Sequence, residues 1–194
     1  MNSNIHSCFY DIIQKFKDSM ENQIKMKIFI TGQPGVGKTT LLRRVYNFCR
    51  DKGILVCGFI TEEVRDGRFR VGFELVILGD NQRLNFASIY KETPHKFGKY
   101  FLDINSLESA VDKIFCLDSD LYIIDEIGKM EFYSDKFREK IHEVMKNDRF
   151  KIIASLHRDF VQEFKKYGKV YYLTQENRDV VFEEIKQEIL MLKR

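Results

Sequence analysis

From residue 26 onward, short apolar runs alternate with segments in which apolar residues recur every three or four positions. Short runs rich in β-branched residues predict strands, and the wider spacing predicts one buried face of a helix. We therefore expect strands at 27–30, 121–124, 150–155 and 170–173, and helices at 38–49, 106–117, 134–146, 159–167 and 177–192. The expected helix caps are Asn105 or Ser106 for the second helix, Ser134 for the third and Asn177 for the last. Strands that alternate with helices in this way predict an α/β fold, with a mostly parallel sheet and helices on both faces.

One part of the chain breaks this alternation. Two strand-like runs, 54–64 and 68–78, flank Asp66-Gly67, a dipeptide that favours a two-residue hairpin because both turn positions need positive φ. A third strand is expected at 82–89, and an extended stretch near 100–104. The sequence thus predicts an antiparallel β-hairpin insertion in the parallel sheet.

The first 25 residues form a separate amphipathic extension ahead of the domain at 26–194. Their apolar positions have helical spacing, and they are Ile5, Phe9, Ile12, Ile13, Phe16, Met20 and Ile24. This extension is either an added helix or an over-extended reading frame, since Met26 offers a second start. It carries no chemistry that we can name.

The composition narrows the class of protein. The chain has 194 residues, 44% of them apolar and 31% charged, and this balance predicts a folded globular domain. A net charge of +3 gives no electrostatic basis for binding nucleic acid. The longest apolar run, Ile54–Ile60, is far short of the ~18 residues that span a bilayer. We expect neither a nucleic-acid nor a membrane partner.

The four cysteines, at positions 8, 49, 57 and 116, show no C-x-x-C spacing. Of the four histidines only His6 lies near a cysteine, Cys8, and no grouping has the spacing of a zinc site, so a zinc site or a redox pair is not expected. We expect reduced thiols in a cytoplasmic protein, with Cys57 and Cys116 as small core residues. The N-terminus lacks the pattern of an export signal.

The strongest motif lies between the first strand and the first helix of the domain. A complete G-x-x-x-x-G-K-T match, followed by a second threonine, consists of Gly32, Gln33, Pro34, Gly35, Val36, Gly37, Lys38, Thr39 and Thr40. Glycines let consecutive backbone N–H groups point at phosphate oxygens, and the helix N-terminus adds unsatisfied donors. Lys38 is placed to reach the β- and γ-phosphates, and the Thr39 hydroxyl to bind Mg²⁺.

The second motif follows the apolar strand at 121–124. Asp125 comes at the carboxyl end of this strand, where ligands bind in open α/β sheets, and is expected to hold Mg²⁺. Glu126 is expected to orient and deprotonate the attacking water, a task that hydrolysis requires and that a carboxylate can perform.

Several further residues are weaker candidates. Arg65 or Arg70, beside the hairpin turn, is a candidate internal arginine finger on the γ-phosphate. The alternative is that these arginines pair with Glu62, Glu63 and Asp66 on a solvated hairpin. Glu131 is the reserve candidate for the base. Ser155 and His157, at the end of the strand at 150–155, are candidates to contact the γ-phosphate, although a surface-loop position is favoured for His157. Arg158 and Arg178 are further candidates to approach the phosphates, and charge placement at helix ends explains them equally well.

The sequence lacks the motifs that mark several other classes of P-loop protein. There is no N-K-x-D or T-K-x-D run to read guanine, no L-S-G-G-Q-like signature of a transporter ATPase, and only one P-loop. These observations favour a compact enzyme that hydrolyses nucleotides with little discrimination between bases.

The chain resembles the thermostable nucleoside-triphosphatase family, also called the cancer-related NTPase family. The resemblance rests on Met26–Thr40 (MKIFITGQPGVGKTT), Asp125–Glu131 (DEIGKME), Gly58–Arg65 (GFITEEVR), Arg70–Phe73 (RVGF) and Thr174–Arg178 (TQENR). It covers about residues 26–190, and DEIGKME is its most specific part. Family members usually begin near the position of Met26, so the extension is a departure.

The resemblance implies a RecA-like P-loop fold and Mg²⁺-dependent hydrolysis of ATP, GTP, CTP, UTP and TTP to diphosphates. Two alternatives stay open on the sequence. One is a phosphotransferase that passes the γ-phosphate to a small metabolite, and the other is a nucleotide-driven switch with an unknown protein partner.

Overall fold

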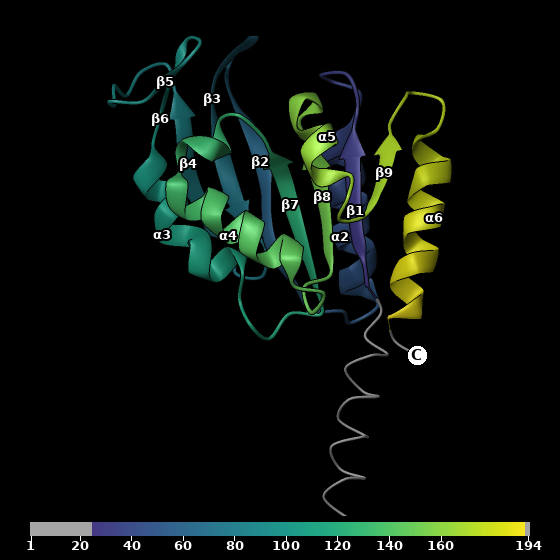
Figure 1. The fold of residues 1–194 in the computed structure, drawn as a ribbon. Coiled ribbons are helices and arrows are strands. Elements are labelled where there is room, and N and C mark those ends of the chain that lie inside the picture. Colours follow the sequence, from purple (N-terminus) through teal and green to yellow (C-terminus); the bar gives the residue numbers. More distant parts are fainter. Residues whose placement is uncertain (1–24, 193–194) are drawn as a thin grey trace, which may run out of the picture.

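The computed structural model describes residues 25–192, and one nine-stranded sheet runs through them in the order β5-β6-β4-β3-β2-β7-β8-β1-β9 (Figure 1). The strands are β1 (Lys27–Thr31), β2 (Val56–Asp66), β3 (Phe69–Ile77), β4 (Arg83–Ser88), β5 (Lys96–Phe97), β6 (Tyr100–Leu102), β7 (Leu121–Ile127), β8 (Ile152–Leu156) and β9 (Lys169–Tyr172). The helices are α2 (Lys38–Asp51), α3 (Ile104–Ile114), α4 (Asp135–Lys146), α5 (Val161–Phe164) and α6 (Arg178–Met191), with 3-10 turns η1 (Glu131–Tyr133) and η2 (Arg158–Phe160).

The sheet has a parallel half and an antiparallel half. Strands β2, β7, β8, β1 and β9 pair in parallel, whereas β2–β3, β3–β4, β4–β6 and β6–β5 pair antiparallel. The expected parallel α/β core with an antiparallel insertion is therefore confirmed. The insertion is larger than the sequence indicated, because it comprises four strands after β2 and forms one whole side of the sheet.

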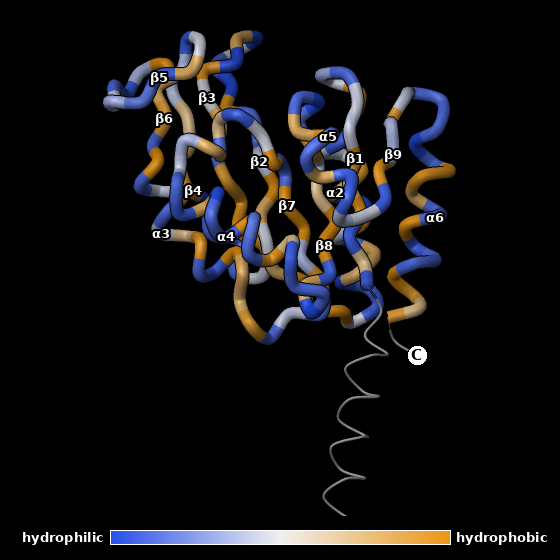
Figure 2. The backbone as a smooth tube through the Cα atoms, in the orientation of Figure 1, coloured by the Kyte–Doolittle hydropathy of each residue, from blue (hydrophilic) through white to orange (hydrophobic). Residues whose placement is uncertain are grey.

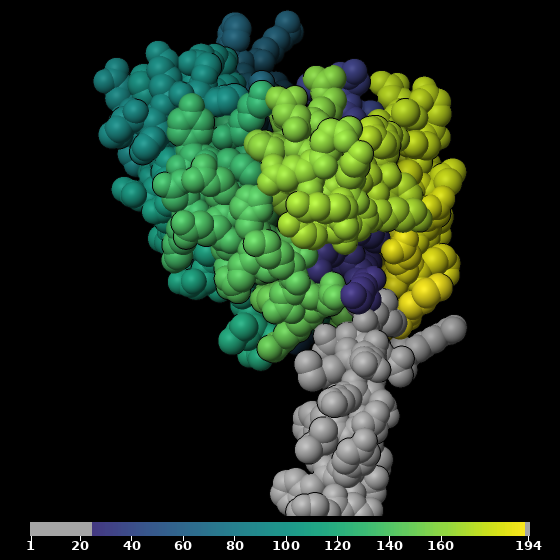
Figure 3. Space-filling model, viewed as in Figure 1, coloured from purple at the N-terminus to yellow at the C-terminus, as the bar shows by residue number. Residues whose placement is uncertain are grey.

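Helices cover both faces of the sheet and form two apolar layers. On one face α2 and α6 pack on β1 and β7 through side chains such as Leu42 and Ile185. On the other face α3, α4 and α5 bury side chains such as Phe137 and Phe164. Each such buried side chain contributes on the order of 1.5–3 kcal/mol. Figure 2 shows the apolar residues gathered on the central strands, and in Figure 3 the green surface of α4 and α5 covers the middle of the sheet.

The helix ends follow local chemistry. The Ser134 hydroxyl caps α4 as expected, accepting from the Phe137 N–H at 3.0 Å. For α3 the expected cap was wrong: Asp103, two residues before Asn105, accepts from the Ser106 N–H at 3.2 Å. The expected helix at 159–167 is also shorter, because η2 takes its first turn.

The cysteine prediction requires a correction. Cys57 at the start of β2 and Cys116 after α3 form a disulfide, so they are not two reduced core thiols. Their positions, 59 residues apart in the chain, become neighbours only through the packing of α3 on the sheet, which no spacing rule anticipates. Cys49, on α2, is a buried free thiol as expected.

Two further predictions concern the N-terminal extension and the absence of a membrane-spanning segment. The proposed extension at 1–25 lies, up to residue 24, outside the described residues. Within residues 25–192, none of the helices combines the length and the apolar character that crossing a membrane requires.

Candidate nucleotide-binding and hydrolysis site

The loop from residue 32 to 37 connects β1 to α2 at the carboxyl edge of the parallel strands. All five residues of β1 are buried, which fixes where the loop begins. Gly37 takes the N-cap position of α2 with a φ of 98°, a conformation that a residue with a side chain rarely adopts. No side chain caps α2, so its first N–H groups point into the loop without a side-chain acceptor. Such an end attracts an anion.

A cleft of about 600 Å³ lies over this loop. Seven of the nine motif residues line it, namely Gly32, Pro34, Gly35, Gly37, Lys38, Thr39 and Thr40. The other two do not: Val36 is buried beneath the loop, and the Gln33 side chain accepts a hydrogen bond from Arg158 at 3.2 Å. The Lys38 ammonium crosses the loop to donate to the Gly32 carbonyl at 3.3 Å.

Asp125 lies in β7 beside the start of α2, where the pairing of β7 with β8 shifts register. Only 2% of it is exposed. One carboxylate oxygen accepts from the Ser155 hydroxyl at 2.6 Å, while the other, Oδ2, has no hydrogen-bond partner. Burial raises the pKa of this carboxyl, and the hydroxyls of Ser155 and Thr39 partly offset the rise. A buried carboxylate oxygen without a partner, next to a threonine hydroxyl, fits a divalent cation.

Glu126 follows directly and lines the cleft from the other side. Burial raises the pKa of its carboxyl to about 7, and the positive charge of Lys38 reduces the rise. A carboxyl group with a pKa near neutral pH has the proton affinity that suits a general base. The structure therefore brings Lys38, Thr39, Asp125 and Glu126 together, as the sequence predicted.

The two hairpin arginines lie elsewhere. Neither Arg65 nor Arg70 is among the residues that line the cleft. Both guanidinium groups pair with Glu63, that of Arg70 at 2.8 Å, and Arg70 also donates to the Tyr100 hydroxyl at 3.0 Å. These bonds lower the pKa of the Glu63 carboxyl, with the hydrogen bond from Arg70 as the main cause. An arginine contact to the γ-phosphate stays a prediction.

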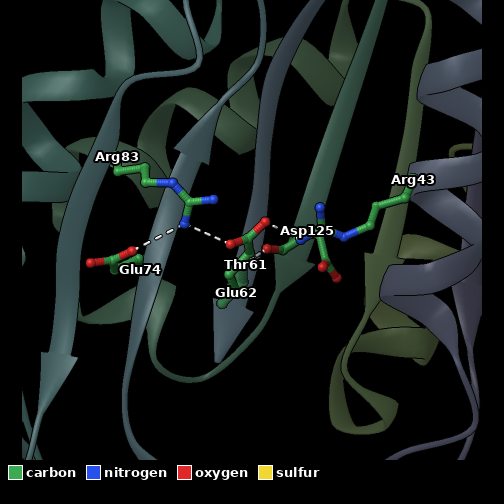
Figure 4. A network of polar contacts seen from close by, with 6 residues as sticks. All are labelled: Arg43, Thr61, Glu62, Glu74, Arg83 and Asp125. Atoms are coloured by element: carbon green, nitrogen blue, oxygen red, sulfur yellow. Dashed lines mark hydrogen bonds and ion pairs between the residues drawn. The ribbon is translucent and has the colours of Figure 1, made fainter. Parts of the chain in front are cut away.

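A polar network beside the loop was missed by the sequence analysis (Figure 4). Glu62 of β2 bonds Arg43 of α2 at 2.5 Å and Arg83 of β4 at 2.6 Å, and Arg83 also reaches Glu74 at 3.2 Å. Arg43 and Glu62 line the cleft. Arg43 lies one helical turn after Thr39, so it was visible as a residue on the same face of the helix. Its carboxylate partner comes from a different strand, and no sequence signal pairs the two.

Thr61, the residue before Glu62, was missed as well. Its hydroxyl donates to the backbone carbonyl of Asp125, which ties β2 to the irregular part of β7. Thr61 also lines the cleft.

Three of the weaker candidates also surround the loop. Arg178, at the start of α6, donates from Nε to the Val36 carbonyl at 2.7 Å and so braces the loop from below. His157 and Arg158 line the cleft on the opposite side. Burial lowers the pKa of the His157 imidazole, so this ring is mainly neutral at pH 7.

A sequence profile of the NTPase family matches residues 27–186, which span the loop, Asp125, Glu126 and Arg178. The chain belongs to the NTPase family. The enzyme class predicted from the sequence, a nucleoside-triphosphatase, is confirmed by this membership.

Individual members of the NTPase family are similar to the chain over nearly their whole length. It is 45% identical over 168 residues to the nucleoside-triphosphatase THEP1 of Methanocaldococcus jannaschii, an alignment that covers 85% of this chain and 98% of that protein. With the protein of the same name from Pyrococcus abyssi it shares 38% identity over 168 residues, 84% of this chain and 92% of that one.

Two solved structures of the NTPase family have the same fold. The crystal structure of THEP1 from the hyperthermophile Aquifex aeolicus matches with a TM-score of 0.70 at 32% identity, over 87% of this chain and 100% of that one. The solution structure of a human cancer-related nucleoside triphosphatase also gives 0.70, at 30% identity over 84% and 97%. The predicted P-loop NTPase fold is confirmed.

Proposed function

We propose that this member of the NTPase family is a Mg²⁺-dependent nucleoside-triphosphate phosphohydrolase with broad base specificity, acting on ATP, GTP, CTP, UTP and TTP. The observation that carries the proposal is the unpartnered Oδ2 of Asp125, buried beside the Thr39 hydroxyl and adjoining the phosphate loop. A polar atom in this position is costly to bury without a partner, and a cation offsets that cost.

The triphosphate binds along the loop at 32–37. Its oxygens accept from the backbone N–H groups at the start of α2, and the Lys38 ammonium moves from the Gly32 carbonyl to the β- and γ-phosphates. Arg178 holds the loop in this conformation both with and without bound nucleotide, because its hydrogen bond to the Val36 carbonyl does not involve the nucleotide.

The Thr39 hydroxyl and Asp125 would hold Mg²⁺, together with phosphate oxygens and water. When bound, Mg²⁺ supplies positive charge that offsets the charge of the phosphate oxygens. The hydrogen bond from Ser155 holds the Asp125 carboxylate in the orientation that leaves Oδ2 free.

Glu126 acts on the water. Its carboxylate lies next to Lys38 in the cleft, so a water molecule between Glu126 and the γ-phosphate donates a hydrogen bond to the carboxylate. The carboxylate takes the proton as the oxygen attacks phosphorus, and the nucleoside diphosphate leaves. The chemistry takes place at the phosphates, and this is consistent with broad base specificity.

The test is phosphate release from the purified protein with each of the five triphosphates, in Mg²⁺ and in EDTA. We expect turnover of all five within about one order of magnitude, and none in EDTA. In parallel, Glu126→Gln is expected to bind nucleotide and not to hydrolyse it. Wild-type turnover by Glu126→Gln would show that the base is a different group.

A further inference from the structure

A second cavity, of about 270 Å³, lies next to the nucleotide cleft. It lies between the antiparallel half of the sheet and the segment that follows β7. We call it the side chamber. Thr39, Thr61 and Glu126 line both cavities, so the side chamber opens at the place where the γ-phosphate is expected. A single attacking water does not need a space of this size, which is close to that of small-molecule sites.

The walls of the side chamber are largely apolar. Phe73 of β3, Phe86 of β4 and Phe97 of β5 face Met130, which follows β7. The rings are held from outside the chamber: Phe73 packs edge-to-face on Tyr100, at 5.3 Å between centroids, and Phe97 on a further tyrosine at 6.3 Å. Three aromatic side chains on one wall provide a preformed surface for an apolar body or for the face-on approach of a cation.

Half of the polar side chains that line the side chamber are carboxyl groups. They are Glu63, Asp125, Glu126 and Glu131, and the others are Thr39, Thr61, Lys129 and His157. Glu131, at the start of η1, is 6% exposed, and its own backbone N–H donates a hydrogen bond to its carboxyl. Burial, together with the nearby Glu126, raises the pKa of this carboxyl well above its ordinary value, so it holds a proton unless a cation binds beside it. Its Oε2 lies 2.8 Å from the point where a side chain on Gly128 would begin, and Glu126 Oε1 lies 3.5 Å from the same point. The carboxyls of Glu131 and Glu126 therefore face one space that only a glycine leaves open.

The cations near the side chamber already have acidic partners. Lys129 pairs with Asp159 at 2.5 Å, and Arg65 and Arg70 both pair with Glu63. Lys38 belongs to the phosphate loop. Glu131 takes part in no ion pair within residues 25–192, so a bound cation would favour its ionised carboxylate, whereas an anionic ligand would gain no attraction from it.

The proposed Mg²⁺ position at Thr39 and Asp125 lies at one end of the side chamber, and a second metal ion is a poor occupant for the part between Glu131 and the aromatic rings. Among residues 25–192, no group of three or more histidine, cysteine, aspartate or glutamate side chains converges closely enough to hold one. The aromatic walls offer a metal no oxygen ligands. The remaining complement to carboxyl oxygens beside aromatic rings is a ligand that donates hydrogen bonds, carries positive charge and has an apolar body.

We propose that the side chamber binds a small organic amine, with its ammonium on Glu131 and its apolar body against Phe73, Phe86 and Phe97. This site adjoins the nucleotide cleft and shares part of its wall, but binding of the amine does not depend on hydrolysis. Because Glu126 lines both cavities, the bound amine lies next to the position of the attacking water.

The test uses two probes that differ in charge. Tyramine has a phenol ring and an ammonium, and 4-hydroxyphenylacetate has the same ring with a carboxylate. Calorimetric titration of the full chain at pH 7 is expected to give at least tenfold tighter binding of tyramine. Glu131→Gln, which keeps the shape and removes the carboxyl group that can ionise beside an ammonium, is expected to weaken tyramine binding at least tenfold. Glu139→Gln, on the exposed side of α4, is the matched control and should bind tyramine as the wild type does.

A second variant guards against misfolding of the first. Gly128→Ala adds one methyl group 2.8 Å from Glu131 Oε2 and is expected to weaken tyramine without changing the unfolding midpoint by more than a few degrees. Absence of tyramine binding, equal binding of both probes, or full tyramine affinity in Glu131→Gln would each overturn the inference. Binding of a non-hydrolysable ATP analogue, measured on the same samples, tests the proposed function separately, so either claim can fail alone.

Discussion

Glu126→Gln replaces the proposed base with a neutral side chain of the same shape. This substitution should abolish hydrolysis and, at the same time, raise the free energy of unfolding. Glu126 ionises in the folded protein with a pKa of about 7, against an ordinary value of 4.5, because burial disfavours the charged carboxylate. A raised pKa means that the folded state holds the proton more tightly than the unfolded state does. Stability from this group is therefore fully present below pH 4.5 and is lost as the pH rises through 7.

The two pKa values set the magnitude. At pH 8 Glu126 is ionised in both states, and the difference between the pKa values corresponds to about 3 kcal/mol of lost unfolding free energy. At pH 5 the same linkage gives about 1 kcal/mol. A glutamine at position 126 has no such ionisation. Glu126→Gln should therefore gain about 3 kcal/mol over the wild type at pH 8 and about 1 kcal/mol at pH 5.

Urea unfolding without nucleotide, at both pH values, measures this difference. The Cys57–Cys116 disulfide must be in the same state in both proteins, because it constrains the unfolded chain. Glu139→Gln on the surface of α4 serves as the control and should change stability by less than about 0.5 kcal/mol. A Glu126→Gln protein that is no more stable than the wild type at pH 8 would refute the claim that burial raises the pKa of Glu126.

Three further predictions concern turnover and binding. Lys38→Ala should weaken nucleotide binding about 10- to 100-fold in a titration with a non-hydrolysable analogue, because it removes a charged hydrogen bond to phosphate; Lys140→Ala on α4 is the control. The hydrolysis rate of the wild type should rise about tenfold between pH 6 and pH 8, as the fraction of ionised Glu126 rises from about 0.1 to 0.9; a flat profile would argue against this base. Arg178→Ala should raise the Kd for the analogue about three- to tenfold, through loss of the 2.7 Å bond to Val36; an unchanged Kd would show that the loop needs no brace.

The sequence predicted what depends on local spacing. Gly37 takes the positive φ that the turn from a buried strand into α2 requires. The apolar run at 121–124 places Asp125 at the edge of the sheet where that loop lies. The cap of α4 at Ser134 was predicted for the same reason, since a serine before an amphipathic run satisfies the first free N–H groups.

What the sequence did not reveal depends on contacts between distant strands. The pairing of Cys57 with Cys116 and the bond from Arg43 to Glu62 form only after the sheet has assembled. The attachment of Arg65 and Arg70 to Glu63 was considered only as pairing with nearby acids, because i, i+2 neighbours and cross-strand partners cannot be ranked without the register of β2 and β3.

The most direct test of the central claim is a crystal structure with Mg²⁺ and a non-hydrolysable ATP analogue. We predict the β- and γ-phosphates within hydrogen-bond distance of the N–H groups from Gly35 to Thr39, and the metal between the Thr39 hydroxyl and Asp125. A triphosphate bound elsewhere on the molecule, or a metal held away from Asp125, would contradict the account.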